Sequence, residues 1–170
     1  MAQAVASFGV AGWSPLCGSG VVIFVTVGTQ LPFDRLVRPV DAWAARTGRR
    51  DILAQIGPSK LRPQAVEYRP FLSPAEFSRH FASAELVIAH AGMGSILSAM
   101  SQGKPILVMP RRASLNEHRN DHQLATARRF KEMGRVLVAM DEQELDAQLS
   151  RVESIPTAPR IGRGRKKPRP

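Results

Sequence analysis

The feature that most constrains this 170-residue chain is a regular alternation of short apolar runs with longer amphipathic stretches. Apolar runs without polar alternation are typical of strands buried on both faces of a sheet. Strands are expected at residues 21–27, 52–56, 66–72, 86–89, 106–109 and 136–140, of which 66–72 is the weakest. Because helical patterns lie between them, the order predicts an α/β domain, with a mostly parallel sheet covered by helices.

Local signals place the helices. Ser73 to Glu76 predict a capping box with Pro74 in the first turn, and Gly134 predicts the end of a later helix. Helices are expected from about Pro32, from Pro74, over 94–102, from about Asp121 to Gly134, and over 142–149. The side chains expected to face the core are Leu36, Val40, Trp43, Ile96, Leu97, Met100, Leu124, Ala127, Phe130 and Met133.

Composition divides the chain into three parts. Residues 1–20 are glycine-rich, lack periodicity and predict a flexible extension; residues 21–150 predict the folded domain. Residues 151–170 carry seven Lys or Arg against one acid, Glu153, so most of the net charge of +10 lies there. Such a Pro- and Gly-rich basic tail is expected to be disordered. It either only solubilises the chain or binds an anionic membrane surface, an acidic partner or nucleic acid.

Cysteine usage and the first residues bear on the compartment. Cys17 is the single cysteine, which excludes an internal disulfide framework and suits a reducing compartment. The first basic residue is Arg35, so the cationic start of a signal peptide is missing. The longest apolar run, residues 21–25, is far shorter than the roughly 20 residues that span a bilayer. A cytoplasmic protein is therefore expected.

Three loops should converge at the carboxyl edge of the sheet, where ligands bind in parallel α/β folds. They are residues 28–30, 90–95 and 110–123. In the middle loop, Gly92 and Gly94 precede a helix whose free N–H groups favour an anion such as a diphosphate. Ser95 adds a hydroxyl, and His90 can donate a proton or a hydrogen bond to a phosphate oxygen. The alternatives are a turn that only packs tightly and a histidine that only ends a strand.

The ordered motifs resemble a known family. HAGMGSI, then Gly103-Lys104-Pro105, a strand, Pro110 and Asp121-His122-Gln123 resemble the donor-binding signature of glycosyltransferase family 28. VTVGTQLPFDRLV resembles the first strand and phosphate-side loop of the same domain. The resemblance covers about residues 21–149 and implies a single Rossmann-like domain, the C-terminal half of a two-lobed glycosyltransferase. It is greatest to the small separate donor-binding subunits of exopolysaccharide and dolichol-linked GlcNAc synthesis.

This resemblance implies a role for particular residues. Gly28 and Thr29 would border the diphosphate, while Asp121 and Gln123 would contact the sugar hydroxyls. The residues that would hold the phosphates of a UDP-sugar are His90, Gly92, Gly94 and Ser95, with Met93 in the same loop. His90 is also the candidate catalytic residue, through contact with the leaving group. One position departs from the family, because Ser98 stands where an acidic residue usually holds the ribose.

Other roles are open for several of these residues. Asp121 can be a helix N-cap, which is compatible with sugar binding. Arg111, like Arg112 and Arg119, can contact a diphosphate or an acidic sugar, or be a solvated loop residue. Glu117 and His118 are either an acid–base pair near the site or ordinary polar loop residues.

The resemblance implies an enzyme that works as a pair. The chain would be the donor-binding, catalytic subunit of an inverting hexosyltransferase, carrying a hexosyl group from a UDP-sugar to a polyprenyl-diphosphate-linked acceptor in exopolysaccharide or glycolipid synthesis. It would need no cofactor or metal. A membrane-anchored acceptor-binding subunit would supply the acceptor site and the base. The complex would lie peripherally at the inner face of the cytoplasmic membrane.

Two other functions stay open. One is a nucleotide-sugar-binding module without transferase activity. The other is nucleic-acid binding through the tail, but the body has no basic aromatic platform, so no specific nucleic acid is expected.

Overall fold

The computed structural model describes residues 23–134 and 136–152. Within them the strands are β1 (Ile23–Thr26), β2 (Ile52–Gln55), β3 (Glu67–Arg69), β4 (Leu86–His90), β5 (Ile106–Met109) and β6 (Leu137–Val138). The helices are α1 (Asp34–Thr47), α2 (Pro74–Ser83), α3 (Met93–Ser101), α4 (His122–Met133) and α5 (Glu142–Val152), with a short 3-10 turn at Ala113–Leu115. The predicted flexible extension and the basic tail beyond Val152 lie outside the described residues.

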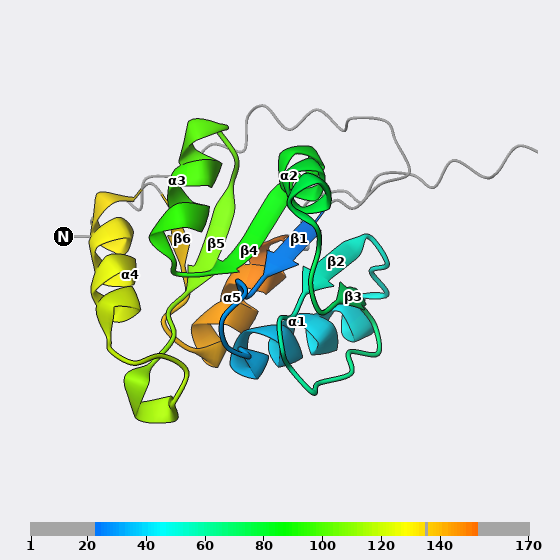
Figure 1. Ribbon diagram of the computed structural model, residues 1–170, viewed down its shortest axis with the longest axis horizontal. Coiled ribbons are helices and arrows are strands. Elements are labelled where there is room, and N and C mark those ends of the chain that lie inside the picture. The colour runs from blue at the N-terminus through cyan, green and yellow to red at the C-terminus, as the bar shows by residue number, and fades with distance from the viewer. Residues whose placement is uncertain (1–22, 135, 153–170) are drawn as a thin grey trace, which may run out of the picture. The chain divides into compact units, whose positions relative to one another are not determined.

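The strands form one sheet in the order β3-β2-β1-β4-β5-β6 (Figure 1). Every pairing is parallel, with β1 lying between β2 and β4. The chain runs outward from β1 to one edge, then returns to β4 and runs to the other edge. The loops that leave β1 and β4 therefore diverge, and this switch point is where parallel α/β sheets hold their ligands. The predicted α/β fold is confirmed.

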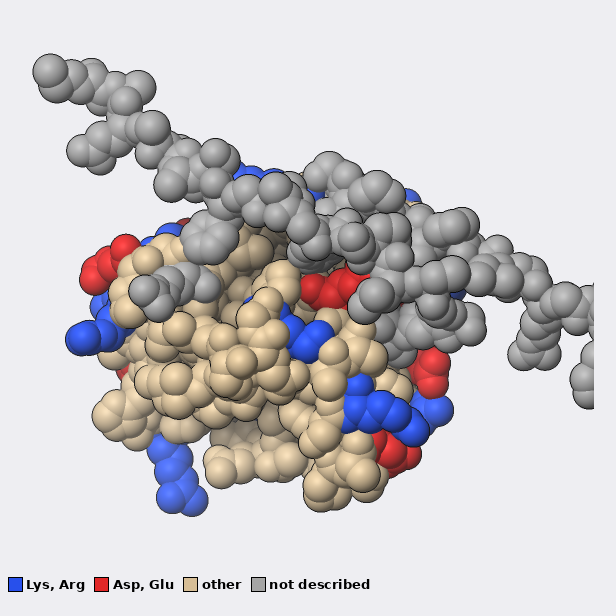
Figure 2. Space-filling model, turned by 90° about the horizontal axis from the view of Figure 1, so that it is seen from above, with Lys and Arg blue, Asp and Glu red and all other residues tan. Residues whose placement is uncertain are grey.

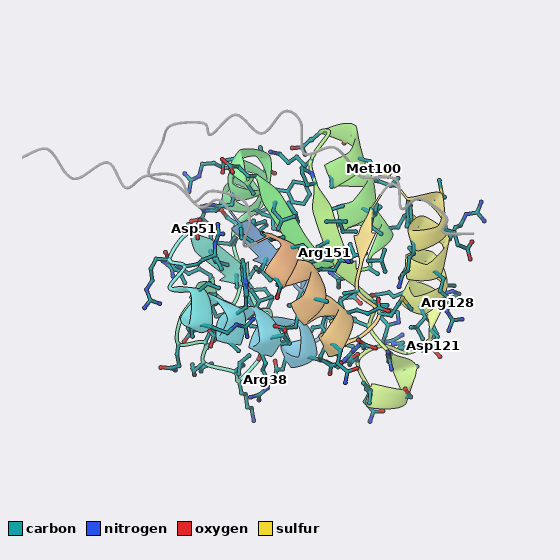
Figure 3. All side chains as sticks on the ribbon, turned by 180° about the vertical axis from the view of Figure 1, so that it is seen from behind. Arg38, Asp51, Met100, Asp121, Arg128 and Arg151 are labelled. Atoms are coloured by element: carbon teal, nitrogen blue, oxygen red, sulfur yellow. The ribbon has the colours of Figure 1, made fainter. Side chains whose placement is uncertain are left out.

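Helices cover both faces of the sheet. Helices α1 and α5 lie together behind the sheet in Figure 1 and in front of it in Figure 3. Helices α2, α3 and α4 share the opposite core, where Phe81, Ile96, Ala99, Ala127 and Phe130 pack on strand residues. Because successive strand residues point to opposite faces, each central strand is buried on both sides, which explains its unbroken apolar run.

The structure confirms the helix ends that were predicted from Ser73, Glu76 and Gly134. Ser73 Oγ accepts a hydrogen bond from Glu76 N at 3.3 Å, and a Glu76 carboxylate oxygen accepts one from Ser73 N at 2.9 Å, so the predicted capping box is present. Gly134 adopts the left-handed conformation at φ +63° and ends α4 as expected. Helix α1 starts two residues after Pro32, because Phe33 occupies the N-cap and is buried.

Two residues predicted to face the core are exposed. Leu97 is 53% exposed and Met133 is 50% exposed. Helix α3 buries Ile96 and Ala99, and Leu97 is rotated about 100° from Ile96, which turns it away from the sheet. Met133 lies in the last turn of α4, after Phe130 has taken the last inward position.

The ends of some elements also differ from the sequence prediction. Strands β3 and β6 are shorter than the expected runs, and α5 extends to Val152 instead of ending at residue 149. Arg151, assigned to the tail from composition, therefore lies on α5.

Candidate functional site

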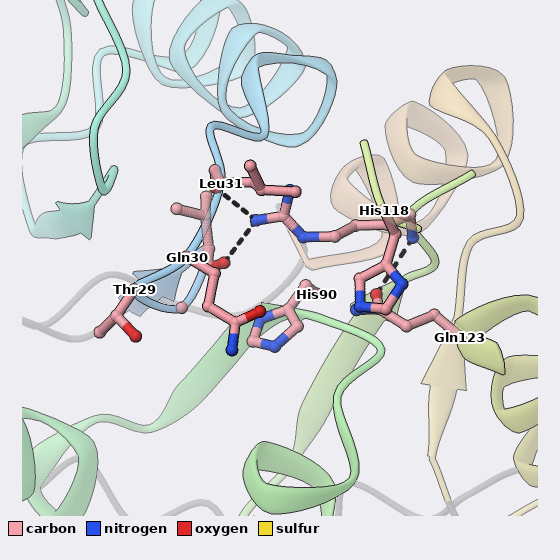
Figure 4. A pocket seen from close by; sticks show the side chains of 9 residues that line it. Thr29, Gln30, Leu31, His90, His118 and Gln123 are labelled. Atoms are coloured by element: carbon pink, nitrogen blue, oxygen red, sulfur yellow. Dashed lines mark hydrogen bonds between the residues drawn. The ribbon is translucent and has the colours of Figure 1, made fainter. Parts of the chain in front are cut away.

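A pocket of about 300 Å³ lies at the switch point of the sheet. Its walls come from the β1–α1 loop, the end of β4 and the segment between β5 and the start of α4 (Figure 4). The lining residues are Val27, Gly28, Thr29, Gln30, Leu31, His90, Arg111, His118 and Gln123. The structure thus brings together Gly28, Thr29, His90, Arg111 and Gln123, which the sequence had singled out from three separate loops.

His90 ends β4, and its ring lies between two glycines. A Cβ atom on Gly92 would lie 2.3 Å from His90 Nε2, and one on Gly28 would lie 3.0 Å from His90 Cε1. Gly28 also has φ +80°, which other residues rarely adopt. Both glycines therefore make room for the imidazole, a role that the glycine pattern alone did not reveal.

The surroundings of His90 favour the neutral ring. Burial, together with the nearby positive charge of Arg111, lowers the pKa of His90 from 6.5 to about 4, against a smaller opposing effect of the Thr26 backbone. Nδ1 is buried and has no hydrogen-bond partner among the described residues. A neutral imidazole keeps one N–H donor and one acceptor, so His90 can donate a single hydrogen bond without carrying charge.

The start of α3 lies next to His90 and is open. Gly92 is the N-cap residue, and no side chain in the described part of the chain caps the helix. The first N–H groups of a helix have no intrahelical partner, and here they belong to Met93, Gly94 and Ser95. A Cβ on Gly94 would meet nothing within 4 Å. These residues do not line the pocket, but the helix end offers N–H donors and a partial positive charge to an anion.

Arg111 forms part of the framework of the pocket. Its Nη1 donates to the carbonyls of Pro32 at 2.7 Å and Glu117 at 3.1 Å, and its Nη2 donates to those of Val27 and Leu31, both at 2.7 Å. The residue is 3% exposed, so the solvated-loop interpretation is wrong. Burial lowers the pKa of Arg111 to about 10, which leaves it charged near neutral pH. Both terminal nitrogens are already occupied by backbone carbonyls.

Asp121 and Gln123 lie differently with respect to the pocket. Gln123 is buried and lines it; its Oε1 accepts from Arg111 N at 3.1 Å, which leaves the amide nitrogen to serve as a donor. Asp121 is exposed and does not line the pocket, and its Oδ1 accepts from Ala113 N at 2.9 Å. It holds the N-cap position of α4, as expected, but its side chain makes no capping hydrogen bond.

Two pocket residues, Gln30 and His118, had no assigned binding role from sequence. Gln30, from the β1–α1 loop, and His118, from the segment after β5, line the same pocket as His90 and Gln123 (Figure 4). The signal available in the sequence was that both residues lie in loops expected at the carboxyl edge of the sheet. Glu117, which precedes His118, does not line the pocket, and its carboxylate pairs with Arg35 at 2.8 Å.

Three further observations bear on the site. In the part of the chain that the structure describes, no three His, Cys, Asp or Glu side chains come together to hold a metal ion. Among the same residues, no helix is long and apolar enough to cross a membrane. On the described surface visible in Figure 2, Lys and Arg are scattered among Asp, Glu and uncharged residues, without a continuous basic face.

Known proteins resemble this chain over part of their length. UDP-N-acetylglucosamine transferase subunit ALG13 of Eremothecium gossypii is 41% identical over 78 residues, 45% of this chain and 36% of that protein. The human protein of the same name is 32% identical over 123 residues, 66% of this chain and 10% of that protein. This chain thus spans about a third and a tenth, respectively, of the two relatives.

Solved structures share the fold. The solution structure of ALG13 has a TM-score of 0.55 at 23% identity, covering 80% of this chain and 87% of that one. The glycotransferase of kitacinnamycin has a TM-score of 0.55 at 19% identity, covering 92% of this chain and 40% of that one. The sequence also matches the glycosyltransferase family 28 C-terminal domain over residues 22–161. The chain belongs to the family of glycosyltransferase family 28 C-terminal domains, and its fold is that of the C-terminal lobe of two-lobed glycosyltransferases.

Proposed function

We propose that this chain is the donor-binding subunit of a two-component hexosyltransferase and that it binds a UDP-sugar at the switch point of its sheet. The family membership carries the proposal: a glycosyltransferase domain has its pocket at the ligand-binding edge, beside an open helix N-terminus. UDP-N-acetylglucosamine is the first donor to test, because both relatives compared above are named as subunits that transfer it.

The proposed donor lies across two neighbouring features. The diphosphate is placed at the start of α3, where the N–H groups of Met93, Gly94 and Ser95 and the helix dipole favour negative charge. Gly28 and Thr29 border it from the β1–α1 loop. The sugar extends into the pocket, where the free Gln123 amide can donate to a hydroxyl, and Asp121 contacts the sugar from the rim.

His90 and Arg111 receive different proposed roles. His90, neutral and placed between the two loops, donates one hydrogen bond to a phosphate oxygen instead of transferring a proton as an imidazolium. Arg111 acts through its charge, since its terminal nitrogens are bonded to carbonyls. A fixed positive charge beside the leaving diphosphate stabilises the negative charge that develops as the glycosidic bond breaks. This arrangement is proposed to need no metal.

A second subunit completes the proposed enzyme. We assign it the polyprenyl-diphosphate-linked acceptor and the base that takes the acceptor proton. The word "subunit" in the relatives' names supports a partner. Synthesis of an exopolysaccharide or a glycolipid at the inner face of the cytoplasmic membrane, with the basic tail on anionic lipid, is the proposed setting.

The sharpest test removes the negative charge of Asp121 and keeps the shape of its side chain. Asp121→Asn keeps an oxygen for Ala113 N but removes the carboxylate charge that would bind a sugar hydroxyl. Asp141→Asn is the matched control, because Asp141 Oδ1 accepts from Glu144 N at 2.8 Å and does not line the pocket. Transfer is measured from UDP-N-acetylglucosamine to a polyprenyl-diphosphate-linked sugar. One reaction uses membranes that contain the candidate partner, and the other uses detergent without those membranes.

We expect transfer only when the partner is present. Asp121→Asn should lower it about tenfold, the difference between a charged and a neutral hydrogen bond, while Asp141→Asn leaves it unchanged. Equal activity of the chain with and without the partner would contradict the two-component proposal. Saturable donor binding without transfer in any combination would favour the nucleotide-sugar-binding module.

A further inference from the structure

Two arginines cross between the two loops that form the outer walls of the pocket. Arg111, which follows β5, donates to the carbonyls of Val27, Leu31 and Pro32 in the β1–α1 loop. Arg35 crosses in the opposite direction: it belongs to the first turn of α1 and reaches the loop that follows β5. The segment after β5 and the start of α1 therefore each supply an arginine that binds across this side of the pocket.

Glu117 accepts hydrogen bonds from both arginines, Arg35 and Arg111. Arg35 Nε donates to one Glu117 carboxylate oxygen and Arg35 Nη2 to the other, each at 2.8 Å. The second oxygen also accepts from Arg112 N at 2.9 Å, and the Glu117 backbone carbonyl accepts from Arg111 at 3.1 Å. Arg35 Nη2 further donates to the Pro110 carbonyl at 2.8 Å. The loop is thus bonded at its start and just before His118.

This ion pair differs from the exposed pairs of the same chain. The Arg35 and Glu117 side chains are only 11% and 12% exposed, and their contact is bidentate. The pair between Arg46 and Asp146, which joins α1 to α5, is 53% exposed at both ends and has a single contact. A bidentate, partly buried pair fixes the geometry of its two segments, whereas an exposed single contact constrains little.

We propose that Arg35 and Glu117 are positioning residues, which with Arg111 set the separation of the two pocket walls and hold His118 in the lining of the pocket. The identity of the ligand rests on the proposed function, but the coupling of the loops does not. The pocket is then formed before the donor binds. Donor binding therefore does not carry the entropy cost of ordering residues 111–120.

The test separates positioning from simple stabilisation. Glu117→Gln keeps the size of the side chain but removes its charge and one of the two acceptor oxygens facing Arg35. Arg35→Gln breaks the same pair from the other side, and Asp146→Asn is the control in an exposed pair on α1 and α5. Two quantities are measured on folded protein well below its melting temperature: the amide hydrogen-exchange rates of residues 27–31 and the dissociation constant for UDP-N-acetylglucosamine.

We expect Glu117→Gln and Arg35→Gln each to speed exchange in residues 27–31 and to weaken binding about tenfold. Asp146→Asn should leave both quantities at the wild-type value. A lower melting temperature with wild-type exchange and wild-type affinity would overturn the proposal, because the pair would then only stabilise the fold. If one variant fails to fold, the other decides.

The result also distinguishes this proposal from the function it rests on. If the wild-type chain does not bind UDP-N-acetylglucosamine, the proposed donor is wrong, and the exchange rates alone decide the coupling of the loops. Faster exchange of residues 27–31 in Glu117→Gln and Arg35→Gln would then support the coupling of the two loops, and unchanged exchange would overturn it.

Discussion

The neutral state of His90 makes the stability of the fold depend on pH in a specific direction. The pKa of His90 falls from 6.5 to about 4 in the folded chain, mainly through burial. Between these values the unfolded chain binds the proton more strongly, so stability is fully present above the unfolded pKa and is lost as the pH falls. From about pH 7.5 to about pH 5 this one group should remove roughly 2 kcal/mol from the free energy of unfolding.

Replacing the titrating ring isolates this contribution. His90→Gln should remove about 2 kcal/mol of the pH dependence between the same two pH values, although its stability at high pH can differ from that of the wild type. Urea unfolding followed by far-UV circular dichroism at each pH gives the free energies. His122→Gln, a change of an exposed histidine at the start of α4, is the control substitution. Parallel pH profiles for wild type and His90→Gln would refute the neutral, buried assignment.

Two further substitutions, each compared with a control substitution, test other parts of the site. Gly92→Ala should cost roughly 1–3 kcal/mol, because its Cβ would lie 2.3 Å from His90 Nε2, whereas Gly94→Ala, with nothing within 4 Å, should be neutral or stabilising in thermal unfolding. Equal losses for the two alanines would contradict the packing of His90 between glycines. Ser98→Glu on the exposed face of α3 should tighten UDP binding but leave 2′-deoxy-UDP binding unchanged, as measured by calorimetry against Ser101→Glu. Equal gains for both nucleotides would indicate a general charge effect instead of a ribose contact.

The sequence predicted the framework because local signals and tertiary packing agree there. The unbroken apolar runs could be satisfied only by strands buried on both faces, and the parallel order then placed three loops at one edge. Ser73 with Glu76 and Gly134 define helix ends through bonds within a few residues. Such short-range chemistry is visible without the fold.

The finer details of the site depended on contacts between distant residues. The packing of Gly28 against His90 joins the loop after β1 to the end of the neighbouring strand β4. The bonds of Arg111 to the β1–α1 loop join residues about 80 positions apart. No local pattern distinguishes a buried arginine bonded to carbonyls from a solvated one. Leu97 was misplaced because the apolar stripe of Ile96, Leu97 and Met100 did not show which side of α3 faces the sheet.

Titration of the chain with UDP-N-acetylglucosamine, followed through its amide NMR signals, tests the central claim most directly. We predict saturable shifts at Gly28 and Thr29 and at Met93, Gly94 and Ser95, with a further shift at Gln123. UDP alone should reproduce the shifts at the start of α3 but not the one at Gln123, since it lacks the sugar. No saturable shift at millimolar donor, or shifts confined to residues outside the switch point, would contradict a donor site at this edge of the sheet.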